Sequence, residues 1–339
     1  MYYIPYLLDV NIYLEANIND VLFTGKLVKS LLIDANSRLK EIFTKTRGVQ
    51  PKLVHITPLY QVSNGKTKCL YSYATVDTVE SRVVRIHETI IRNGVYKFYI
   101  GFIEDKVNDA VSFDIIYNTL LNISGVHRFK KYRVKVELAS VDIVDVYAYA
   151  ENIVQELLRN KKKLKVVFSS PTLLRDPLRA SKQKSLIPSP INIFSTPTYI
   201  NLYLSGKLRR RNMMRTLVLL HRLLNEPYSI FNTVNIKWII YDEDKQPIPT
   251  LTGYINLYLN RTYYEEYNRK YNLEELLQKT FTTILTLGTG TSRATGFGHI
   301  TIQPKQHHDG RLLMISNGAS ADLNRKLINK SYKLMTRSN

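Results

Sequence analysis

The chain has 339 residues, 44% of them hydrophobic, which is enough for two packed domains. Its single cysteine, Cys69, excludes an internal disulfide framework and a thiolate zinc site. No apolar run approaches the ~20 residues of a membrane span, and the first ten residues do not resemble a signal peptide. The sequence therefore predicts a cytoplasmic protein without a membrane partner.

The charge is strongly positive, with 48 Lys and Arg against 28 Asp and Glu and a net charge of +20. Such an excess indicates a polyanionic partner, because each phosphate that a basic side chain neutralises releases condensed counterions. A solvated basic surface that serves only solubility is the alternative. The positive residues are clustered, and this clustering favours nucleic acid.

The first half of the chain alternates strand and helix patterns. Residues 8–14 alternate apolar and polar side chains, which predicts a half-buried strand. Residues 26–43 place apolar side chains on one helical face, after helix-start candidates Asp20 and Thr24. Asp105 or Asn108 is expected to cap a second helix, over residues 110–121. Further strands are predicted over residues 53–61, 68–77, 96–103 and 132–147. This order suits the split β-α-β fold.

The second half repeats this order after a connector over residues 151–165 that contains a short helix. A strand over residues 164–169 precedes a proline-rich basic loop over 171–197 and a helical pattern over 199–224. Residues 236–241 and 251–259 are expected to form a hairpin, and Asn272 to cap a helix that ends at Leu287. A glycine-rich loop and a strand over residues 299–303 follow.

The glycine-rich loop, residues 288–298, lies between a predicted helix and a predicted strand. Glycines let the backbone adopt positive φ and approach a ligand, exposed amides can bind an anion, and Arg293 could hold a phosphate. A P-loop or a dinucleotide-binding loop runs from strand into helix, which is the opposite order. By its glycines alone, the loop could equally be a structural tight turn.

The loop has the form G-x-G-x-S-R-x-x-G-F-G, and this form resembles the C-terminal signature of the RAMP superfamily of CRISPR-associated proteins. Within that superfamily, the chain resembles the archaeal-type endoribonucleases that process precursor CRISPR RNA at its repeats. Segments 52–59, 166–174 and 188–190 are similar to segments of that family, and the resemblance extends to about residue 304. It implies an α+β fold of two tandem ferredoxin-like (RRM-like) domains, residues 1–147 and 164–304. A basic tail, residues 305–339, follows; whether it is helical or disordered is open.

The resemblance also implies where RNA binds. RNA is expected along the cleft between the domains, with the glycine loop against its backbone. The residues expected to bind RNA are Gly288, Gly290, Ser292, Arg293, Gly296 and Gly298 of the loop and the run Arg209, Arg210 and Arg211. For the arginine run, a solvated helix face is the alternative.

RNA cleavage by a 2′-hydroxyl requires a base, positive charge at the phosphorus and an acid for the leaving oxygen. No tight Asp/Glu motif for a metal is present, so no metal and no cofactor are predicted. In the resembled family, the site lies beside the first helix and the following strand. The matching residues here are Lys26, Lys29, Lys52 and His55. Each has a plainer reading: the lysines as solvated side chains, His55 as an ordinary partly buried histidine.

Two functions remain in competition. The first is a metal-independent endoribonuclease that cuts single-stranded or hairpin CRISPR repeat RNA, leaves a 2′,3′-cyclic phosphate and releases mature crRNA. The second is a non-catalytic RNA-binding subunit of a CRISPR effector complex. Other subunits of such a complex, or a second copy of the chain in a homodimer, are possible partners. A basic protein that binds nucleic acid generally is weaker, because it leaves the glycine loop unexplained.

Overall fold

The computed structural model describes residues 3–44, 50–63, 66–77, 82–104, 111–159, 163–179, 184–226, 233–242 and 246–304. The chain divides into two units, Met1–Lys305 and Gln306–Asn339, and the second lies wholly outside the described residues. The predicted tail therefore lies outside them, as do Asp105 and Asn108. The prediction that one of these two residues caps the second helix is wrong: that helix begins at Phe113, and Ser112 is its cap, with Ser112 Oγ accepting from the Ile115 amide.

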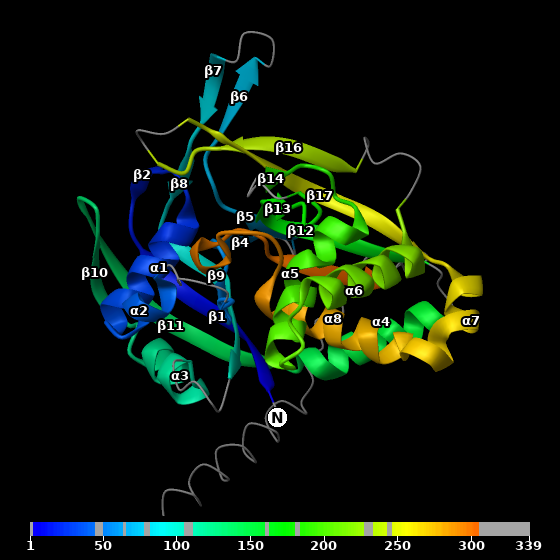
Figure 1. Ribbon diagram of the computed structural model, residues 1–339. Helices are drawn as coiled ribbons and strands as arrows, with labels where there is room; N and C mark the ends of the chain where they lie inside the picture. Colours follow the sequence, from blue (N-terminus) through cyan, green and yellow to red (C-terminus); the bar gives the residue numbers. More distant parts are fainter. Residues whose placement is uncertain are drawn as a thin grey trace, which may run out of the picture. The chain divides into compact units, whose positions relative to one another are not determined.

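The first sheet is antiparallel and is built from the first half of the chain (Figure 1). Its strand order is β10-β11-β1-β9-β4-β5, and β3 also pairs with β9. Helices α1 (Thr24–Ala35) and α3 (Phe113–Leu121) cover one face, and the short α2 (Leu39–Phe43) follows α1. The strands are β1 Ile4–Glu15, β3 Val54–Ile56, β4 Tyr60–Ser63, β5 Lys66–Cys69, β9 Gly94–Glu104, β10 Gly125–Phe129 and β11 Tyr132–Val144.

The second sheet has the order β18-β12-β17-β16-β6-β7, with β15 paired to β17. The helices of the second half lie on one of its faces (Figure 1). Its strands are β6 Tyr73–Asp77, β7 Arg82–His87, β12 Lys163–Thr172, β15 Leu224–Asn225, β16 Val234–Ile239, β17 Ile248–Leu259 and β18 Ile300–Pro304. The helices are α4 Val146–Arg159, α5 Pro190–Leu204, α6 Arg210–Leu223, α7 Arg261–Tyr271 and α8 Leu273–Leu287. Two small sheets pair β2 (Ile18–Val21) with β8 (Thr89–Ile91) and β13 (Leu174–Arg175) with β14 (Lys184–Ser185).

Strands β6 and β7 lie within the predicted N-terminal domain in sequence, yet they pair with the second sheet. Trp238 and Ile239 of β16 pair with Ala74 and Tyr73 of β6. The sequence predicted one strand over residues 68–77. The structure instead has β5 in the first sheet and β6 in the second. The first half therefore contributes a hairpin to the sheet of the second half.

Predictions of one helix, one helix cap and one loop need correction. The helix predicted over residues 26–43 is two helices, because the chain leaves the helix at Asn36, whose side-chain amide donates to Thr119 Oγ1 at 3.0 Å. Asp20 caps no helix, since it lies in β2. The loop predicted over residues 171–197 ends early, because α5 begins at Pro190, where Ser189 Oγ accepts from the Asn192 amide. The mixed α+β class, the β16–β17 hairpin and α8 are confirmed, and the strand pairs of both large sheets are antiparallel.

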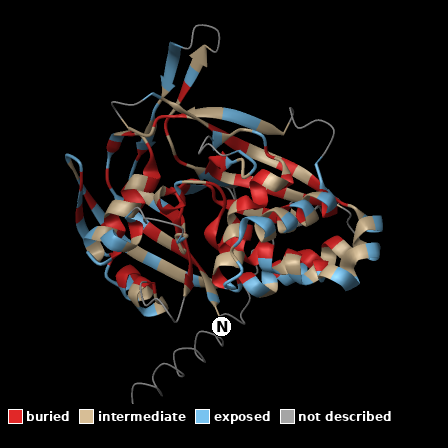
Figure 2. Cartoon of the chain, viewed as in Figure 1, coloured by how far each residue is buried: buried red, intermediate tan, exposed pale blue. Residues whose placement is uncertain are grey.

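Two large buried clusters form the core (Figure 2). In the first, Val10 and Ile12 of β1 and Phe98 of β9 pack against Leu27 and Leu31 of α1. Alternation along β1 and β9 turns the intervening side chains to the opposite face. On that face, Leu7, Tyr99 and Val144 join the second cluster, which contains Phe281 and Ile284 of α8. The first sheet is therefore covered on both faces.

In the part of the chain that the structure describes, no helix is both long enough and apolar enough to span a bilayer.

Gly101 of β9 sets how closely the first sheet approaches α8. A Cβ at this position would overlap the carbonyl oxygen of Thr286 in α8. We therefore expect Gly101→Ala to lower the free energy of unfolding by about 1–3 kcal/mol, as overpacking of a core does. Denaturant unfolding would measure it.

Gly94→Ala, in the same strand, is the matched control, because the nearest atom to its added Cβ would be Tyr96 Cε2 at 4.0 Å. This variant should be neutral or slightly stabilising. Equal destabilisation by both alanines would contradict the close approach of sheet and helix.

Candidate active site

The glycine loop lies against the first half of the chain at α1 and β3. A Cβ on Gly25, in the first turn of α1, would overlap the carbonyl oxygen of Thr295 in the loop. Beside this contact, the rings of Phe23 and Phe297 stack with centroids 4.4 Å apart and planes 16° apart. The loop therefore brings residues of the second half to the start of α1, where the predicted catalytic lysines begin.

Several backbone amides of the loop donate hydrogen bonds to carbonyl oxygens of the protein. The amide of Thr289 donates to Gly298 O (2.8 Å), that of Thr291 to Leu173 O (2.9 Å) and that of Gly298 to Pro171 O (3.0 Å). Gly298 has φ 81°, and a Cβ there would overlap the carbonyl oxygen of Thr289, so the turn requires glycine. Ser292, with φ 59°, is the exposed tip. These amides are not available to a phosphate, and the RNA contacts predicted for the loop stay a prediction.

Arg293 lies inside this junction and is 8% exposed. Its Nη1 donates to Leu287 O and its Nη2 to Lys52 O, each at 2.9 Å. Burial, with the nearby charge of Arg175, lowers the pKa of Arg293 to about 10, so the guanidinium stays charged at neutral pH. The fork predicted to hold an RNA phosphate instead holds two backbone carbonyls of the protein, one from each half. Arg293 is therefore a positioning residue in this structure.

Lys29 and Lys52 are brought together next to Arg293. Lys52 Nζ donates to Phe43 O at 2.7 Å, and Lys29 Nζ lies 3.5 Å from the same oxygen. Burial lowers the pKa of Lys52 to about 8, and the positive charges of Lys29 and Arg293 add to this effect. Burial also lowers the pKa of Lys29. A lysine with such a pKa is a stronger acid near neutral pH than a solvated lysine, whose pKa is about 10.4.

Lys26 is engaged elsewhere on the same helix. Its Nζ forms an ion pair with Asp242 and lies 4.0 Å from the ring centroid of Tyr241. Both partners come from the segment after β16, in the second half of the chain. Lys26 therefore contributes to the junction between the halves, and part of its charge is neutralised.

His55 is fully buried, which the sequence did not reveal. Its Nδ1 is 3.0 Å from Arg293 O, its Nε2 is 3.4 Å from His299 Nδ1, and the two imidazoles stack. Burial, with the proximity of His299 and Arg293, lowers the pKa of His55 far below its usual range, and burial lowers that of His299 to about 4. Both rings are neutral at neutral pH. A catalytic role for His55 would require the loop to move; it stays a prediction.

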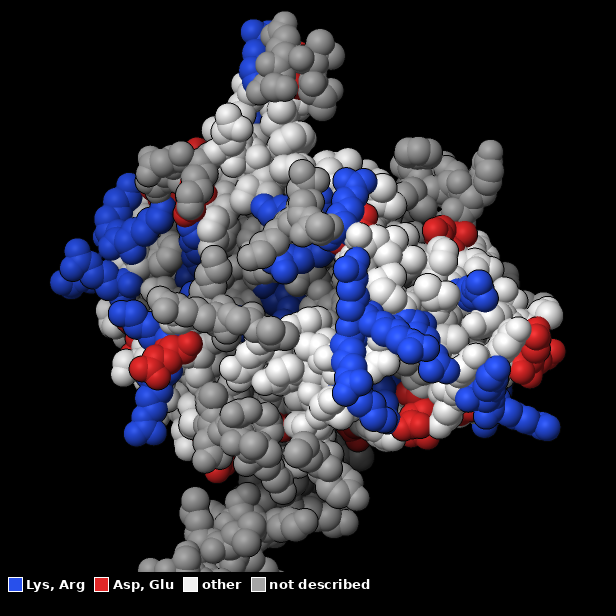
Figure 3. Space-filling model, viewed as in Figure 1, with Lys and Arg blue, Asp and Glu red and all other residues white. Residues whose placement is uncertain are grey.

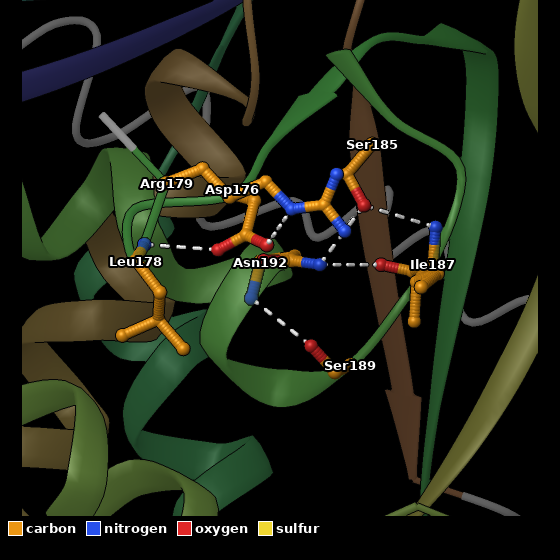
Figure 4. A network of polar contacts seen from close by, with 7 residues as sticks. All are labelled: Asp176, Leu178, Arg179, Ser185, Ile187, Ser189 and Asn192. Atoms are coloured by element: carbon orange, nitrogen blue, oxygen red, sulfur yellow. Dashed lines mark hydrogen bonds and ion pairs between the residues drawn. The ribbon is translucent and has the colours of Figure 1, made fainter. Parts of the chain in front are cut away.

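A basic hairpin within the segment predicted as a proline-rich basic loop flanks the glycine loop. β13 and β14 pair Arg175 with Lys184, and Leu173, just before β13, accepts the amide of Thr291. Figure 4 shows the network beside this hairpin: Asn192 of α5 donates to Ser185 Oγ at 3.1 Å and to Ile187 O at 2.8 Å. Asp176 pairs with Arg179 at 3.2 Å. Arg175 is exposed, so it could present positive charge beside the loop.

The predicted arginine run, Arg209 to Arg211, is exposed at the start of α6. It lies on an element different from those that carry the lysines. Figure 3 shows Lys and Arg side chains over both halves on one face of the molecule. Among the residues that the structure describes, no group of three or more His, Cys, Asp or Glu could hold a metal ion.

Comparison with known proteins finds likeness only in structure. No protein-family profile and no curated protein matches the chain. A Cas6 product complex is 12% identical with a TM-score of 0.53, over 88% of this chain and 99% of that one. Thermus thermophilus Cas6 is 12% identical with a TM-score of 0.51, over 89% and 100%.

The chain has a Cas6-like fold. A chain of a partial Cas6-RT-Cas1–Cas2 complex is also similar, at 13% identity and a TM-score of 0.50, over 91% of this chain and 47% of that one. At such identities the likeness concerns the arrangement of the elements, and the chemistry has to be argued from the residues of this chain.

Arg293→Lys should destabilise the protein, since one ammonium cannot donate to both Leu287 O and Lys52 O. Hydrogen bonds to a charged group contribute about 1.5–3 kcal/mol each, so we expect a loss of that order in the free energy of unfolding. Denaturant unfolding would measure it, with the exposed Arg175→Lys as the control, expected within about 0.5 kcal/mol of wild type. If Arg293→Lys were as stable as wild type, the two hydrogen bonds of the guanidinium would not stabilise the fold.

Proposed function

We propose that the chain is a metal-independent endoribonuclease. It cuts CRISPR repeat RNA by attack of a 2′-hydroxyl on the adjacent phosphorus and gives a 2′,3′-cyclic phosphate and mature crRNA. The observation that carries this proposal is Lys52, a half-buried lysine of pKa about 8 next to Lys29 and under the glycine loop. The Cas6-like fold supports the proposal.

The roles follow from the protonation states. Below pH 8, Lys52 is mainly the ammonium form. Its lowered pKa makes it a stronger acid than a solvated lysine, so we assign to it the protonation of the departing 5′-oxygen. Lys29 supplies positive charge for the phosphorane, and Lys26 contributes to phosphate binding at the start of α1. The proton of the attacking 2′-hydroxyl passes to a water molecule as the bond from phosphorus to the 5′-oxygen breaks. We assign a positioning role to Arg293, and no proton transfer to His55 while the loop covers it.

The order of the strands supports two tandem ferredoxin-like domains. The first sheet contains the series β11-β1-β9-β3 and the second the series β18-β12-β17-β16. In each series, the last strand in sequence pairs with the first, as in the split β-α-β fold. We therefore propose domains over residues 1–147 and 164–304, with the β6–β7 hairpin of the first domain added to the sheet of the second.

A non-catalytic RNA-binding subunit of a CRISPR effector complex is the second candidate. Two observations favour it: Asp242 pairs with Lys26, and His55 is buried. All four residues predicted to be catalytic have partners inside the protein, and those of Lys26 and His55 come from the second half of the chain. Such a subunit would use the same basic surfaces for binding alone.

The test is cleavage of end-labelled CRISPR repeat RNA in the presence of EDTA. We expect a single cut that EDTA does not affect and that a 2′-deoxy substitution at the cut site abolishes. Lys52→Ala should slow cleavage by about 10²-fold or more, the range of a lost general acid. Lys40→Ala, at an exposed position of α2, is the matched control. Tight binding without cleavage by the wild-type protein would support the second candidate instead.

The pH dependence tests the role assigned to Lys52. Because the ammonium is the active form of an acid, kcat/KM should fall as the pH rises through about 8, by about tenfold per pH unit above it. Lys52→Arg should keep RNA binding but lose most of the activity and this descending limb, because an arginine does not release its proton. A kcat/KM that rises through pH 8 would contradict the assignment and indicate a base.

A further inference from the structure

Among the described residues, the second sheet has one face on which no helix packs (Figure 1). Leu251, Ile255 and Leu257 of β17 point to the buried cluster shared with α4, α5, α6 and α8, on the side where Figure 1 shows these helices. Alternation sends the residues between them to the opposite side. Residues directly paired in an antiparallel sheet point to the same side. The register then assigns to this helix-free face Lys163, Lys165, Lys237, Tyr73, Arg85, His87, Tyr254 and Tyr258.

Lysines and aromatic rings are paired along this helix-free face. Lys165 Nζ lies 4.2 Å from the Tyr254 ring centroid, and Lys163 Nζ lies 5.2 Å from that of Tyr258. On the β16–β6 side, Lys237 Nζ lies 4.3 Å from the Tyr73 centroid. Three Lys–Tyr pairs from one sheet face exceed what a solvated basic surface requires. They combine the two groups that a single-stranded nucleic acid recognises, cations for phosphates and rings for bases.

The stack continues to the edge of the sheet. Tyr73 stacks on His87 of β7 with centroids 4.4 Å apart and planes 13° apart, and Thr75 Oγ1 is 3.2 Å from His87 Nε2. β7 is the last strand of this sheet among the described residues. A base can therefore extend the stack beyond His87, next to the exposed Arg85.

The positive charge of this face is not neutralised within the described chain. No acidic side chain pairs with Lys163, Lys165, Lys237 or Arg85 there. Strands β12, β16, β17 and β18 contain no Asp or Glu at all. Four cations without a carboxylate partner on one sheet face favour binding of a polyanion.

The helix-free face adjoins the candidate active site. Ile239, two residues after Lys237 on the same face, packs in a small cluster with Phe23 and Phe297, and Tyr73 and Tyr241 pack against it. Phe23 directly precedes α1, and Tyr241 lies under Lys26. A single-stranded RNA bound on the helix-free face could therefore continue to the lysines of α1.

We propose that the helix-free face of the second sheet is a second binding site for single-stranded RNA, separate from the cleavage site. Bases stack on the rings of Tyr254 and His87, and phosphates lie against Lys163, Lys165 and Lys237. The Tyr73 ring lies between Lys237 and His87 and extends the stack inside the protein. From β12 to β7 the sheet has four steps between neighbouring strands, each about 4.8 Å, so the face is about 19 Å wide. This width suits a short single-stranded segment. The inference rests on the proposed function for the kind of nucleic acid bound.

The test is fluorescence anisotropy with a labelled ten-nucleotide oligouridylate and a ten-base-pair RNA duplex of unrelated sequence. The triple variant Lys163→Ala, Lys165→Ala, Lys237→Ala should bind oligouridylate at least tenfold more weakly than wild type. The slope of log K against log salt should fall in magnitude by about 2, the value for three lost single-strand contacts. Tyr254→Leu, which changes no charge, should weaken binding about tenfold by loss of stacking. Duplex affinity should change little with Tyr254→Leu.

Lys270→Ala is the matched control, because Lys270 also lies over a tyrosine (Tyr271, 5.3 Å) but on helix α7. It should leave oligouridylate binding within twofold of wild type. The proposal is overturned if the triple variant binds like wild type, which would leave the face to a protein partner, or if Lys270→Ala weakens binding equally.

Cleavage of repeat RNA separates this inference from the proposed function. If the wild-type protein cuts no RNA but binds oligouridylate through the helix-free face, only the proposed nuclease function is wrong. If repeat RNA is cleaved normally but oligouridylate binding does not depend on the helix-free face, only the proposed second site is wrong.

Discussion

The guanidinium of Arg293 donates to Leu287 O and Lys52 O, and these two carbonyls belong to different halves of the chain. A buried cation without a carboxylate partner is costly, and here carbonyl dipoles compensate it. They can do so only because the loop passes against α1 closely enough to exclude a Cβ at Gly25. The position of Lys52, and so the proton-transfer chemistry assigned to it, depends on this contact.

The parts of the fold that the sequence predicted well are those with a complete local pattern. β1 alternates from Leu8 to Glu15, and α8 has its apolar residues at helical spacing up to Gly288. The break between α1 and α2 has no such signal, because the apolar spacing continues across Asn36. The start of α5 did have a signal, Ser189 followed by Pro190. It was hidden by the prolines around it, including Pro197 within the helix.

The β6–β7 hairpin shows a different limit. Its strands have strand-like composition, but pairing with β16 joins residues that are more than a hundred positions apart. Local periodicity carries no information on which sheet a strand joins. The same holds for the site: Lys29 and Lys52, both named through the resemblance, lie beside each other because one is in α1 and the other just precedes β3. Whether Arg293 and His55 face solvent or the interior depends on the loop of the other half, and the sequence pattern does not encode this.

Affinity and chemistry have opposite requirements in this molecule. A lysine with a pKa low enough for the proton transfer proposed here must be desolvated or crowded by other cations, and Lys52 next to Lys29 and Arg293 meets that condition. The same crowding disfavours further positive charges at the site, and the ion pair with Asp242 neutralises part of the charge of Lys26. Binding strength then has to come from cations that stay solvated and separate, such as those over the rings of Tyr73 and Tyr254. A separate, helix-free sheet face provides these cations without raising the charge around Lys52.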